Sequence, residues 1–345
     1  MSARLRGIAR QTEEIVEAGH YLATNGRKVV ISGEISAARA GTRLFGPDPV
    51  AVAPDTGHRT ALEVARDTGR RSLFEVTPDA ARRTLFEVTP ESSTQAARRL
   101  TRAGADPVAV LSFASARNPG GGYLNGAQAQ EEALCRASAL YTTLLCAPEY
   151  YAHHRADRDP FYSDRVICSP AVPVFRDDRG ALLDTPYTVG FLTSPAPNAG
   201  VIARRAPEER HRIPAALAVR AERVLETAAV HGYRRLVLGA WGCGVFRNDP
   251  AAVAGAFRAL LTGDGRFAGH FERVVFAVLD RTAGRTTLGA FERILGPFAA
   301  GPAPEDHPHG PGGPAPEPVA PGAADPRPRP PAAPIATPVP APSPR

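Results

Sequence analysis

Two adjacent carboxylates follow a glycine triplet in the first half of the sequence. Seven residues separate Gly120–Gly122 from Gln130, Glu131 and Glu132. Neighbouring helical residues lie about 100° apart around the axis, so the two carboxylates cannot face one small atom from the same side. One can hold a sugar hydroxyl while the other reaches a scissile bond. Acidic residues also favour the first turn of a helix because they complement its dipole, so an ordinary helix start is the alternative interpretation.

A second glycine-rich loop, "GAWGCGVFRNDP", runs from Gly239 to Pro250. Each loop follows a predicted strand and leads into a predicted helix, whose bare backbone amides are a natural phosphate site. Glycine has no Cβ, so its backbone can approach a ligand closely. Two such loops indicate a site for a nucleotide-like diphosphate at the carboxyl ends of strands. Neither loop has the Walker A sequence or the G-x-G-x-x-G dinucleotide pattern.

Strand-like and helix-like segments alternate around these loops. Short apolar runs predict buried strands, and apolar residues at helical spacing predict amphipathic helices. We expect strands over 107–115, 165–175, 187–195, 235–240 and 273–280. We expect helices over 12–21, 132–145, 214–232 and 249–261. Thr12 and Asp249 are the predicted N-caps of the first and the last, and Gly232 is predicted to end the third. The helix from Glu132 has one apolar stripe that reaches Leu145. This alternation indicates an α/β layered fold with a largely parallel central sheet.

The sequence also has a short repeat and a proline-rich end. "RRSLFEVTPDAA" at 70–81 is followed by "RRTLFEVTPESS" at 82–93, and two copies are too few for a solenoid. We interpret them as a local duplication whose first copy adds a loop or an edge strand. Residues 301–345 hold 17 of the 35 prolines and predict a disordered tail. We therefore divide the chain into an N-terminal helical accessory region packed on the core (1–100), a catalytic core (101–298) and a disordered tail (299–345).

The composition is that of a soluble globular protein. The chain has 345 residues, of which 43% are hydrophobic and 22% charged, and its net charge is +6. The basic residues are scattered, so the charge favours the approach of an anionic substrate but does not by itself indicate nucleic-acid binding. No apolar stretch is long enough for a membrane span and no signal peptide is recognised, so we expect a cytoplasmic protein without membrane contact.

Four cysteines stand at Cys135, Cys146, Cys168 and Cys243. None forms a C-x-x-C pair, and no histidine lies at metal-ligand spacing. We therefore expect reduced thiols, without structural zinc or a disulfide framework, and we predict no metal and no cofactor.

Taken together, the motifs resemble one enzyme family. The glycine triplet, the seven-residue spacer and the Gln-Glu-Glu run look like the signature of poly(ADP-ribose) glycohydrolases, in particular of the bacterial type. Similar segments are "ARQTEEIVEAGHY", "SFASARNPGGGYLNGAQAQEEALCRASALY", "SPAVPVFRDD", "FLTSPAPN" and "LVLGAWGCGVFRNDP". The resemblance covers roughly residues 5–298 and leaves out the extra 12-residue copy and the tail. It implies a macrodomain-like three-layer α/β/α fold with a mixed central sheet and with ADP-ribose in a cleft at the strand ends.

The resemblance further implies hydrolysis of the ribose–ribose O-glycosidic bond, with poly(ADP-ribose) or ADP-ribosylated protein as substrate and ADP-ribose as product. Glu132 is then the general acid and base, and Glu131 orients the ribose. The expected substrate-binding residues are Asn118 at the ribose, Gly120, Gly121 and Gly122 at the ribose and diphosphate, Gln130 in support of the loop, Gly242, Gly244 and Val245 at the diphosphate, and Phe246 against the terminal ribose. An acid that works near pH 7 needs a raised pKa, which burial and a neighbouring carboxylate favour and a helix N-terminus opposes. We expect that raised pKa at Glu132.

Two other functions stay open at this point. One is a macrodomain that binds ADP-ribose, or that removes a single ADP-ribose from protein or nucleic acid. The other is an interaction protein that acts through its proline-rich tail. A pure binding module does not require both glutamates, so their presence favours the enzyme. We expect a monomer that acts mainly from the free end of the polymer.

Overall fold

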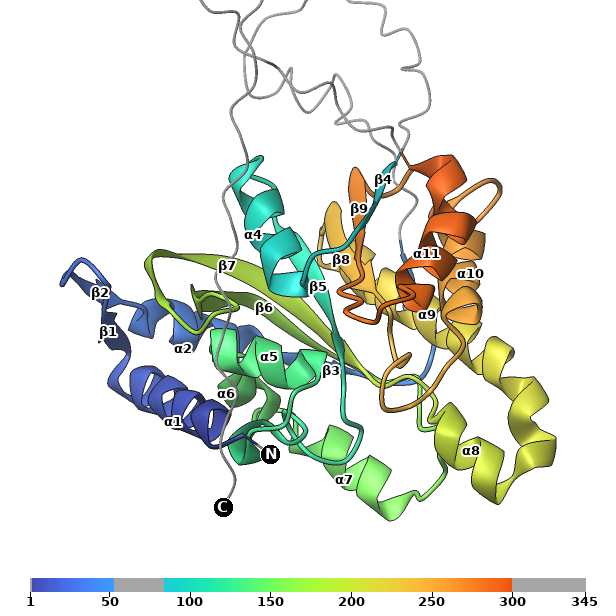
Figure 1. Cartoon of the computed structure of the whole chain (residues 1–345), viewed down its shortest axis with the longest axis horizontal. Coiled ribbons are helices and arrows are strands. Elements are labelled where there is room, and N and C mark those ends of the chain that lie inside the picture. Colours follow the sequence, from blue (N-terminus) through green and yellow to red (C-terminus); the bar gives the residue numbers. More distant parts are fainter. Residues whose placement is uncertain (1, 53–83, 300–345) are drawn as a thin grey trace, which may run out of the picture. The chain divides into compact units, whose positions relative to one another are not determined.

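The computed structural model describes residues 2–52 and 84–299 (Figure 1). Its strands are β1 (His20–Leu22), β2 (Lys28–Val30), β3 (Arg43–Phe45), β4 (Leu85–Thr89), β5 (Val108–Phe113), β6 (Val166–Arg176), β7 (Leu182–Ser194), β8 (Arg235–Gly239) and β9 (Arg273–Ala277). Its α-helices are α1 (Ala3–Ala18), α2 (Ser32–Gly41), α4 (Ser93–Arg102), α5 (Gln130–Ala137), α6 (Leu140–Leu144), α7 (Pro148–Ala156), α8 (Ala199–Arg205), α9 (Ile213–Val230), α10 (Pro250–Leu261) and α11 (Thr286–Leu295). Short 3-10 turns are η1 (Tyr123–Asn125), η2 (Pro207–Arg212) and η3 (Gly296–Phe298).

Seven strands form one mixed sheet in the order β3-β6-β7-β5-β8-β9-β4. The pairs from β7 to β4 are parallel, whereas β3–β6 and β6–β7 are antiparallel. A separate two-stranded sheet pairs β1 with β2. The parallel strands thus lie together, and their carboxyl ends meet at one edge of the sheet.

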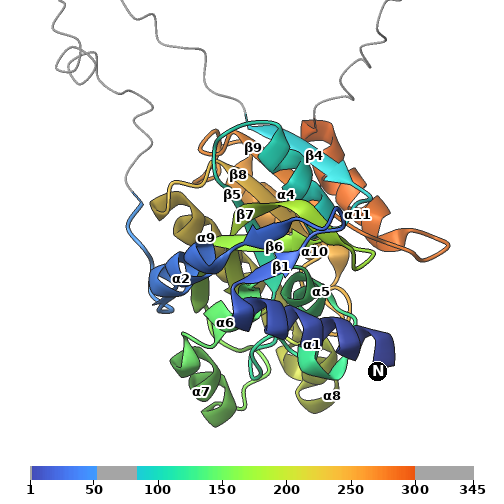
Figure 2. The same cartoon turned by 90° about the vertical axis from the view of Figure 1, so that its left-hand side faces the viewer.

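Helices cover both faces of the sheet, because the central strands are apolar on both sides. Successive side chains of a strand point to opposite faces. In β5, Val108 and Val110 pack in the core shared with α1, α2, α4, α5 and α6, while Ala109 and Leu111 pack in the core shared with α9, α10 and α11. Figure 2 shows α2 on the near side of the sheet, where it packs against β6. The three-layer α/β/α arrangement with a mixed sheet confirms the predicted fold class.

Most of the predicted elements are present with shifted ends. Each of the five predicted strands overlaps one of the strands β5 to β9. Gly232 follows the end of α9 with a left-handed φ of +72°, as its predicted place requires. Asp249 is the N-cap of α10, and its carboxylate accepts a hydrogen bond from the Ala251 N–H at 3.0 Å. Both cap predictions are confirmed.

The single helix predicted from Glu132 to Leu145 is wrong, because the chain breaks it into α5 and α6. Ser138 is extended and pairs with Val174 of β6 in an isolated bridge. The Ser138 hydroxyl donates to the Leu134 carbonyl at 2.7 Å, which satisfies an acceptor at the end of α5. The apolar stripe continues through the break, so periodicity alone could not detect it.

The N-cap predicted at Thr12 is also wrong. Helix α1 begins nine residues earlier, at Ala3, and Ser2 is its N-cap. Thr12 lies inside the helix, buried, and its hydroxyl donates to the Arg136 carbonyl at 3.0 Å. Gly19, with φ of +68°, ends the helix. Threonine is common at helix N-caps, but the Thr12 hydroxyl instead forms a hydrogen bond with helix α5.

The second copy of the 12-residue repeat supplies β4, which pairs with β9 at the edge of the sheet. The first copy, at 70–81, and the tail from residue 300 lie outside the described residues. Both β3 and β4 come from the first hundred residues, so the sheet extends across the predicted division at residue 100. That division stays a prediction. No helix in the described ranges is long and apolar enough to span a bilayer.

Candidate active site

Both glycine-rich loops begin at the carboxyl ends of neighbouring parallel strands. The first loop, residues 114–129, connects β5 to α5, and the second loop, residues 240–249, connects β8 to α10. Because β5 and β8 pair in parallel, the two loops leave the sheet at the same edge. This is the edge at which open α/β sheets usually bind ligands.

Glu132 occupies the third position of α5 and is 7% exposed. Its Oε2 accepts a hydrogen bond from the N–H of Ala129, the residue before the helix, at 3.0 Å. Its Oε1 accepts one from the Gly122 N–H at 2.9 Å. The first bond is half of a capping box, since Ala129 has no side-chain acceptor to form the other half. The carboxylate is therefore fixed between the helix start and the glycine triplet.

Glu131 is buried more deeply, at 2% exposure. Its Oε2 accepts a hydrogen bond from the Ser115 N–H at 2.7 Å, whereas its Oε1 has no partner among the described residues. Burial raises the pKa of Glu131 well above its usual value; the N–H groups of Ser115 and Gly120 act against this rise, and the charge of Glu132 adds to it. The structure thus gives a strongly raised pKa to Glu131, whereas the raised pKa predicted for Glu132 stays a prediction.

The glycine triplet lies directly against these carboxylates. A Cβ at Gly121, where φ is +59°, would lie 2.6 Å from Glu132 Oε1 and 3.2 Å from Glu131 Oε2. A Cβ at Gly122 would lie 2.7 Å from the Cβ of Ala127. Side chains at these positions would collide with the glutamates or with the loop itself. The absence of Cβ atoms therefore lets the loop close over both carboxylates.

Gln130 and Asn118 lie at opposite ends of the first loop. The Gln130 amide accepts a hydrogen bond from the Phe113 N–H at 2.9 Å and donates one to the Leu111 carbonyl at 2.8 Å. It thereby ties the start of α5 to the end of β5. Asn118 is exposed, and its N–H donates to the Ser115 hydroxyl at 3.2 Å. Its side chain therefore lies at the open surface of the loop.

Helix α1 supports the first loop from behind. The Tyr123 hydroxyl donates to Glu13 Oε1 at 2.8 Å and lies 3.2 Å from the Ala9 carbonyl oxygen. Burial raises the pKa of both Tyr123 and Glu13. The Ser2 N–H donates to the Gly126 carbonyl at 3.2 Å. The N-terminal helix is thus joined to the segment that carries the glycine triplet.

A buried cation, Arg136, stands one turn beyond Glu132 on the same helix. It is 8% exposed, and its Nη1 donates to the Ala127 carbonyl at 2.7 Å. Burial lowers the pKa of Arg136, and the charge of Glu132 acts against that decrease. Arg136 belongs to no motif, although its i,i+4 spacing from Glu132 places both on one helix face.

Two side chains of the second loop, which its glycine pattern does not mark, fix its conformation through hydrogen bonds. The Trp241 indole N–H donates to the Ser194 carbonyl at 2.9 Å. The Asn248 amide donates to the carbonyls of Pro197, at 2.8 Å, and Gly242, at 3.2 Å. A Cβ at Gly242 would lie 2.6 Å from the Asn248 Nδ2. Glycine is therefore required where this loop folds back on Asn248.

The tip of the second loop is linked to the first loop through an aromatic side chain. Gly244 is exposed, and Val245 is 80% exposed. The rings of Phe246 and Tyr162 lie 5.8 Å apart, and the guanidinium carbon of Arg117, in the first loop, lies 6.0 Å from the centre of the Tyr162 ring. Sequence reasoning missed Tyr162, because the segment between α7 and β6 has no glycine pattern to mark it.

That segment, residues 157–165, is anchored to the core. Arg220 of α9 is 2% exposed, and it donates to Asp164 Oδ1 at 2.9 Å and to the Pro195 carbonyl at 2.8 Å. His154 accepts hydrogen bonds at Nε2 from the Ser163 N–H, at 3.2 Å, and interacts with the Ser163 hydroxyl at 2.8 Å. Burial lowers the pKa of His154 to about 4. The histidine thus acts as a neutral structural acceptor near pH 7.

The described ranges contain no group of three or more His, Cys, Asp or Glu placed to hold a metal ion. All four cysteines are free, with Cys135 and Cys168 buried and Cys146 exposed. Cys135 lies under the first loop, where a Cβ at Gly120 would be 3.2 Å from its sulfur. Burial raises the pKa of the Cys135 thiol, so its contribution to the site is packing rather than nucleophilic chemistry.

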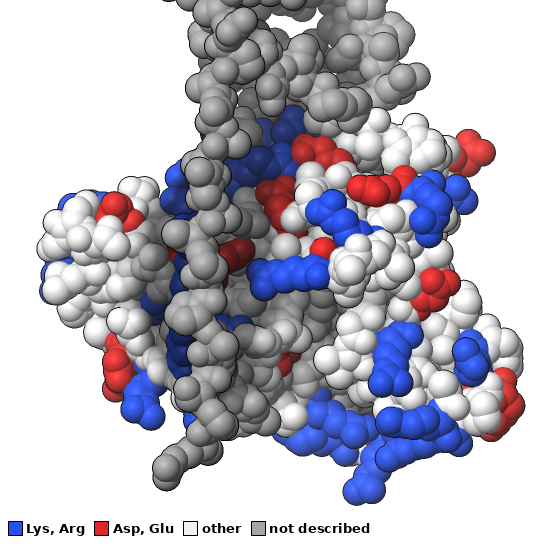
Figure 3. Space-filling model, viewed as in Figure 1, with Lys and Arg blue, Asp and Glu red and all other residues white. Residues whose placement is uncertain are grey.

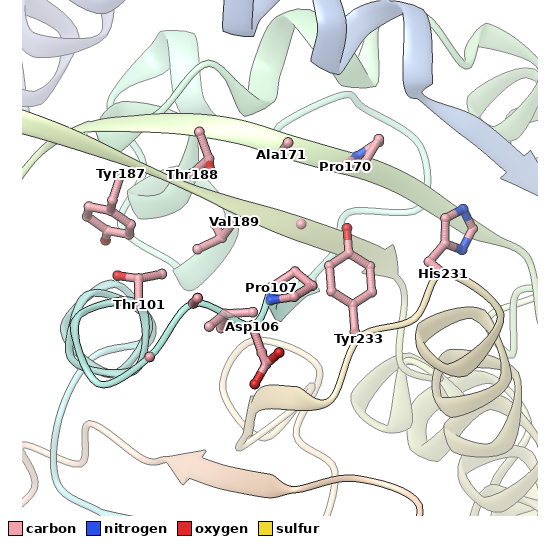
Figure 4. Close-up of a pocket in the computed structure, with 14 residues that line it drawn as sticks. Thr101, Asp106, Pro107, Pro170, Ala171, Tyr187, Thr188, Val189, His231 and Tyr233 are labelled. Carbon is pink, nitrogen blue, oxygen red and sulfur yellow. The ribbon is translucent and has the colours of Figure 1, made fainter. Parts of the chain in front are cut away.

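A hollow of about 540 Å³ lies at the other edge of the sheet (Figure 4). Asp106 and Pro107, which precede β5, form one wall, and Tyr187 and Val189 of β7 form another. Tyr233, which precedes β8, closes the side near α9. These residues lie toward the amino ends of the parallel strands, so the hollow is separate from the two glycine loops.

The chain is similar to proteins of one family over most of its length. The family model for the microbial-type poly(ADP-ribose) glycohydrolase catalytic domain matches residues 9–177. A crystal structure of poly(ADP-ribose) glycohydrolase from Thermomonospora curvata is 49% identical with a TM-score of 0.73, and the match covers 85% of this chain and 100% of that one. The structure of that enzyme with the inhibitor ADP-HPD matches with 49% identity, a TM-score of 0.72 and coverage of 85% and 99%.

The enzyme from Deinococcus radiodurans, in complex with ADP-ribose, matches with 49% identity, a TM-score of 0.64 and coverage of 77% and 98%. No curated protein matches the chain. The identity to the Thermomonospora enzyme extends over nearly the whole of that protein, and it includes a common fold. This chain therefore belongs to the microbial-type poly(ADP-ribose) glycohydrolases, which are glycosidases that hydrolyse poly(ADP-ribose).

Proposed function

We propose that Glu132 is the general acid and base in hydrolysis of the ribose–ribose O-glycosidic bond. As the bond between the anomeric carbon and the leaving oxygen breaks, Glu132 gives its proton to that oxygen. It then takes a proton from water, whose hydroxyl adds to the anomeric carbon, and ADP-ribose is released. The observation that carries this proposal is the fixed position of the Glu132 carboxylate, which the N–H groups of Gly122 and Ala129 hold at the strand edge.

Glu131 is proposed to bind the ribose that is attacked. Its Oε1 is buried without a partner in the described part of the chain, and an unpaired buried polar group costs about 1–3 kcal/mol. A ribose hydroxyl supplies the missing partner. Because its pKa is raised, Glu131 can also carry a proton and donate it in this hydrogen bond. The site is thereby complete only with the sugar in place.

The ligand is proposed to be ADP-ribose, as part of the polymer and as the product. The Deinococcus enzyme was solved with ADP-ribose and the Thermomonospora enzyme with ADP-HPD, which supports this choice. We place the diphosphate between the glycine triplet of the first loop and the exposed tip of the second, Gly244 and Val245. Phe246 then packs against the terminal ribose. Arg117 provides positive charge beside this path.

A product assay on automodified polymer tests these roles. We expect Glu132→Gln to reduce the release of ADP-ribose by about 10²- to 10⁴-fold, the usual contribution of a positioned acid or base. Glu131→Gln, which keeps the shape but not the acidity, should weaken polymer binding and alter the pH profile. Thermal unfolding of both variants shows whether the fold is preserved. Near-normal release by Glu132→Gln would contradict the assignment.

We further propose a monomeric cytoplasmic enzyme that acts mainly from the free chain end. Light scattering tests the first point, and the ratio of ADP-ribose to longer fragments among early products tests the last. The alternative, a module that only binds ADP-ribose, gives a different result in the same assay. Wild-type protein would then bind polymer without releasing ADP-ribose. Membership in a family of glycosidases favours the enzyme.

A further inference from the structure

A group of exposed arginines lies beside the second loop, and we call it the arginine shoulder. It consists of Arg204 and Arg205 on α8, Arg210 on η2 and Arg247 on the second loop. All four are exposed, and no ion pair or side-chain hydrogen bond engages their guanidinium groups in the described part of the chain. In Figure 3, blue side chains gather at the lower right, over the region of α8 in Figure 1. These charges are available to a ligand.

The shoulder is continuous with the active-site loop. The Gly200 N–H of α8 donates to the Phe246 carbonyl at 2.9 Å. A Cβ at Gly200 would lie 3.2 Å from the Arg247 Cδ, so α8 and the second loop are in direct contact. Phe246 in turn faces Tyr162, which bridges to the first loop. The shoulder therefore borders the tip of the second loop beside Phe246.

Nearby carboxylates neutralise only part of this charge. Glu209 pairs with Arg212, which also stacks over the Phe161 ring at 4.9 Å. Asp249 is engaged at the N-terminus of α10, where it accepts from the Ala251 N–H. Asp249 and Glu208 are both exposed beside the shoulder and have no ion pair among the described residues, so four arginines stand against two such carboxylates there. The surface is therefore positive.

We propose that the arginine shoulder binds the pyrophosphate groups of polymer units that lie beyond the unit in the active site. Each ADP-ribose unit carries two phosphate charges, so a polymer is a regular polyanion. Arginine is well suited to such groups because its guanidinium forms paired hydrogen bonds with phosphate oxygens. The shoulder would then make long chains better substrates than short ones. This inference rests on the proposed function of the adjacent site.

The test compares two triple variants with equal loss of charge. The shoulder variant carries Arg204→Gln, Arg205→Gln and Arg210→Gln, and leaves Arg247 in place so that the second loop is unaltered. The control variant carries the same change at three exposed arginines on α2, α10 and α11, namely Arg39, Arg258 and Arg293. Glutamine has a helix propensity close to that of arginine, so both variants should fold.

The measurements are the KM for long polymer and the inhibition constant of free ADP-ribose, each at several salt concentrations. We expect the KM of the shoulder variant to rise about tenfold for long polymer, as three phosphate contacts are lost, and its dependence on salt to become shallower. The inhibition constant of ADP-ribose, which fills the active site alone, should stay nearly the same. The control variant should match the wild type in every measurement.

Equal KM values of the shoulder and control variants for long polymer would overturn the inference. Normal release of ADP-ribose by both variants would not rescue it. It would also fail if single-stranded DNA of equal charge inhibits the wild type as strongly as a non-hydrolysable polymer does, because the surface would then be a nucleic-acid site. The wild type alone gives a further check. If its KM for long polymer and its inhibition constant for ADP-ribose depend equally on salt concentration, the shoulder does not bind polymer phosphates. Failure of the wild type to release ADP-ribose would instead refute the proposed function.

Discussion

Replacing Gly121 by alanine tests whether the glycine triplet positions the Glu132 carboxylate. With φ of +59°, the backbone is in the left-handed region, where a side chain costs about 1–2 kcal/mol. The new Cβ would lie 2.6 Å from Glu132 Oε1, while ordinary contact begins at 3.4 Å, so the oxygen must move by about 0.8 Å, the difference between the two distances. The end of the glutamate side chain moves more easily than backbone. A shift of this size at a reacting group costs about 100-fold in rate.

Gly232→Ala is the matched control for backbone strain. Gly232 has φ of +72° at the end of α9, and a Cβ there would meet nothing within 4 Å. Urea unfolding should show a loss of about 1–2 kcal/mol in the free energy of unfolding for both variants. Release of ADP-ribose from saturating polymer should fall by about 100-fold for Gly121→Ala alone.

A kcat of Gly121→Ala within about threefold of that of Gly232→Ala would show that Gly121 does not position Glu132, since a displaced acid or base must lower the rate of the chemical step. A rise in KM with unchanged kcat would also count against it. That pattern would mean that Gly121 contacts the substrate without positioning Glu132.

Three further outcomes are expected. Glu131→Gln should be more stable than the wild type at pH 8, and the difference in the free energy of unfolding should shrink toward pH 4. The pKa of Glu131 is raised in the folded protein above its unfolded value of 4.5. The wild type therefore loses stability as the pH rises above 4.5, by about 1.4 kcal/mol for each unit by which the pKa is raised. Equal melting temperatures at both pH values would contradict this. Stability should fall as pH drops from 6.5 to about 4, by at most about 3 kcal/mol, because only unfolded chains protonate His154 there; His154→Gln should flatten the profile between these values. Tyr123→Phe should cost about 1 kcal/mol in urea unfolding because Glu13 loses its partner, and an unchanged midpoint would show that this bond adds nothing.

The sequence predicted the layers well where apolar periodicity decides them. The buried run at 107–115 became β5, and Asp249 and Gly232 marked helix ends, because these signals depend on local backbone chemistry. The same kind of signal failed at Ser138, where pairing with β6 interrupts a continuous apolar stripe. It failed again at Thr12, whose hydroxyl bonds to Arg136 far along the chain. Contacts between distant segments leave no local pattern to read.

In the candidate site, too, local features could be predicted from the sequence, whereas contacts between distant segments could not. The sequence was sufficient to predict that two glycine loops follow strands and that the Glu131–Glu132 pair begins a helix, because residue type and spacing encode turns and helix starts. The tertiary structure was needed to show that Tyr162 and Arg117 connect the loops, and that burial strongly raises the pKa of Glu131. Burial, which governs that pKa, depends on how helices and loops from remote parts of the chain close over one another, and no stretch of sequence specifies that alone.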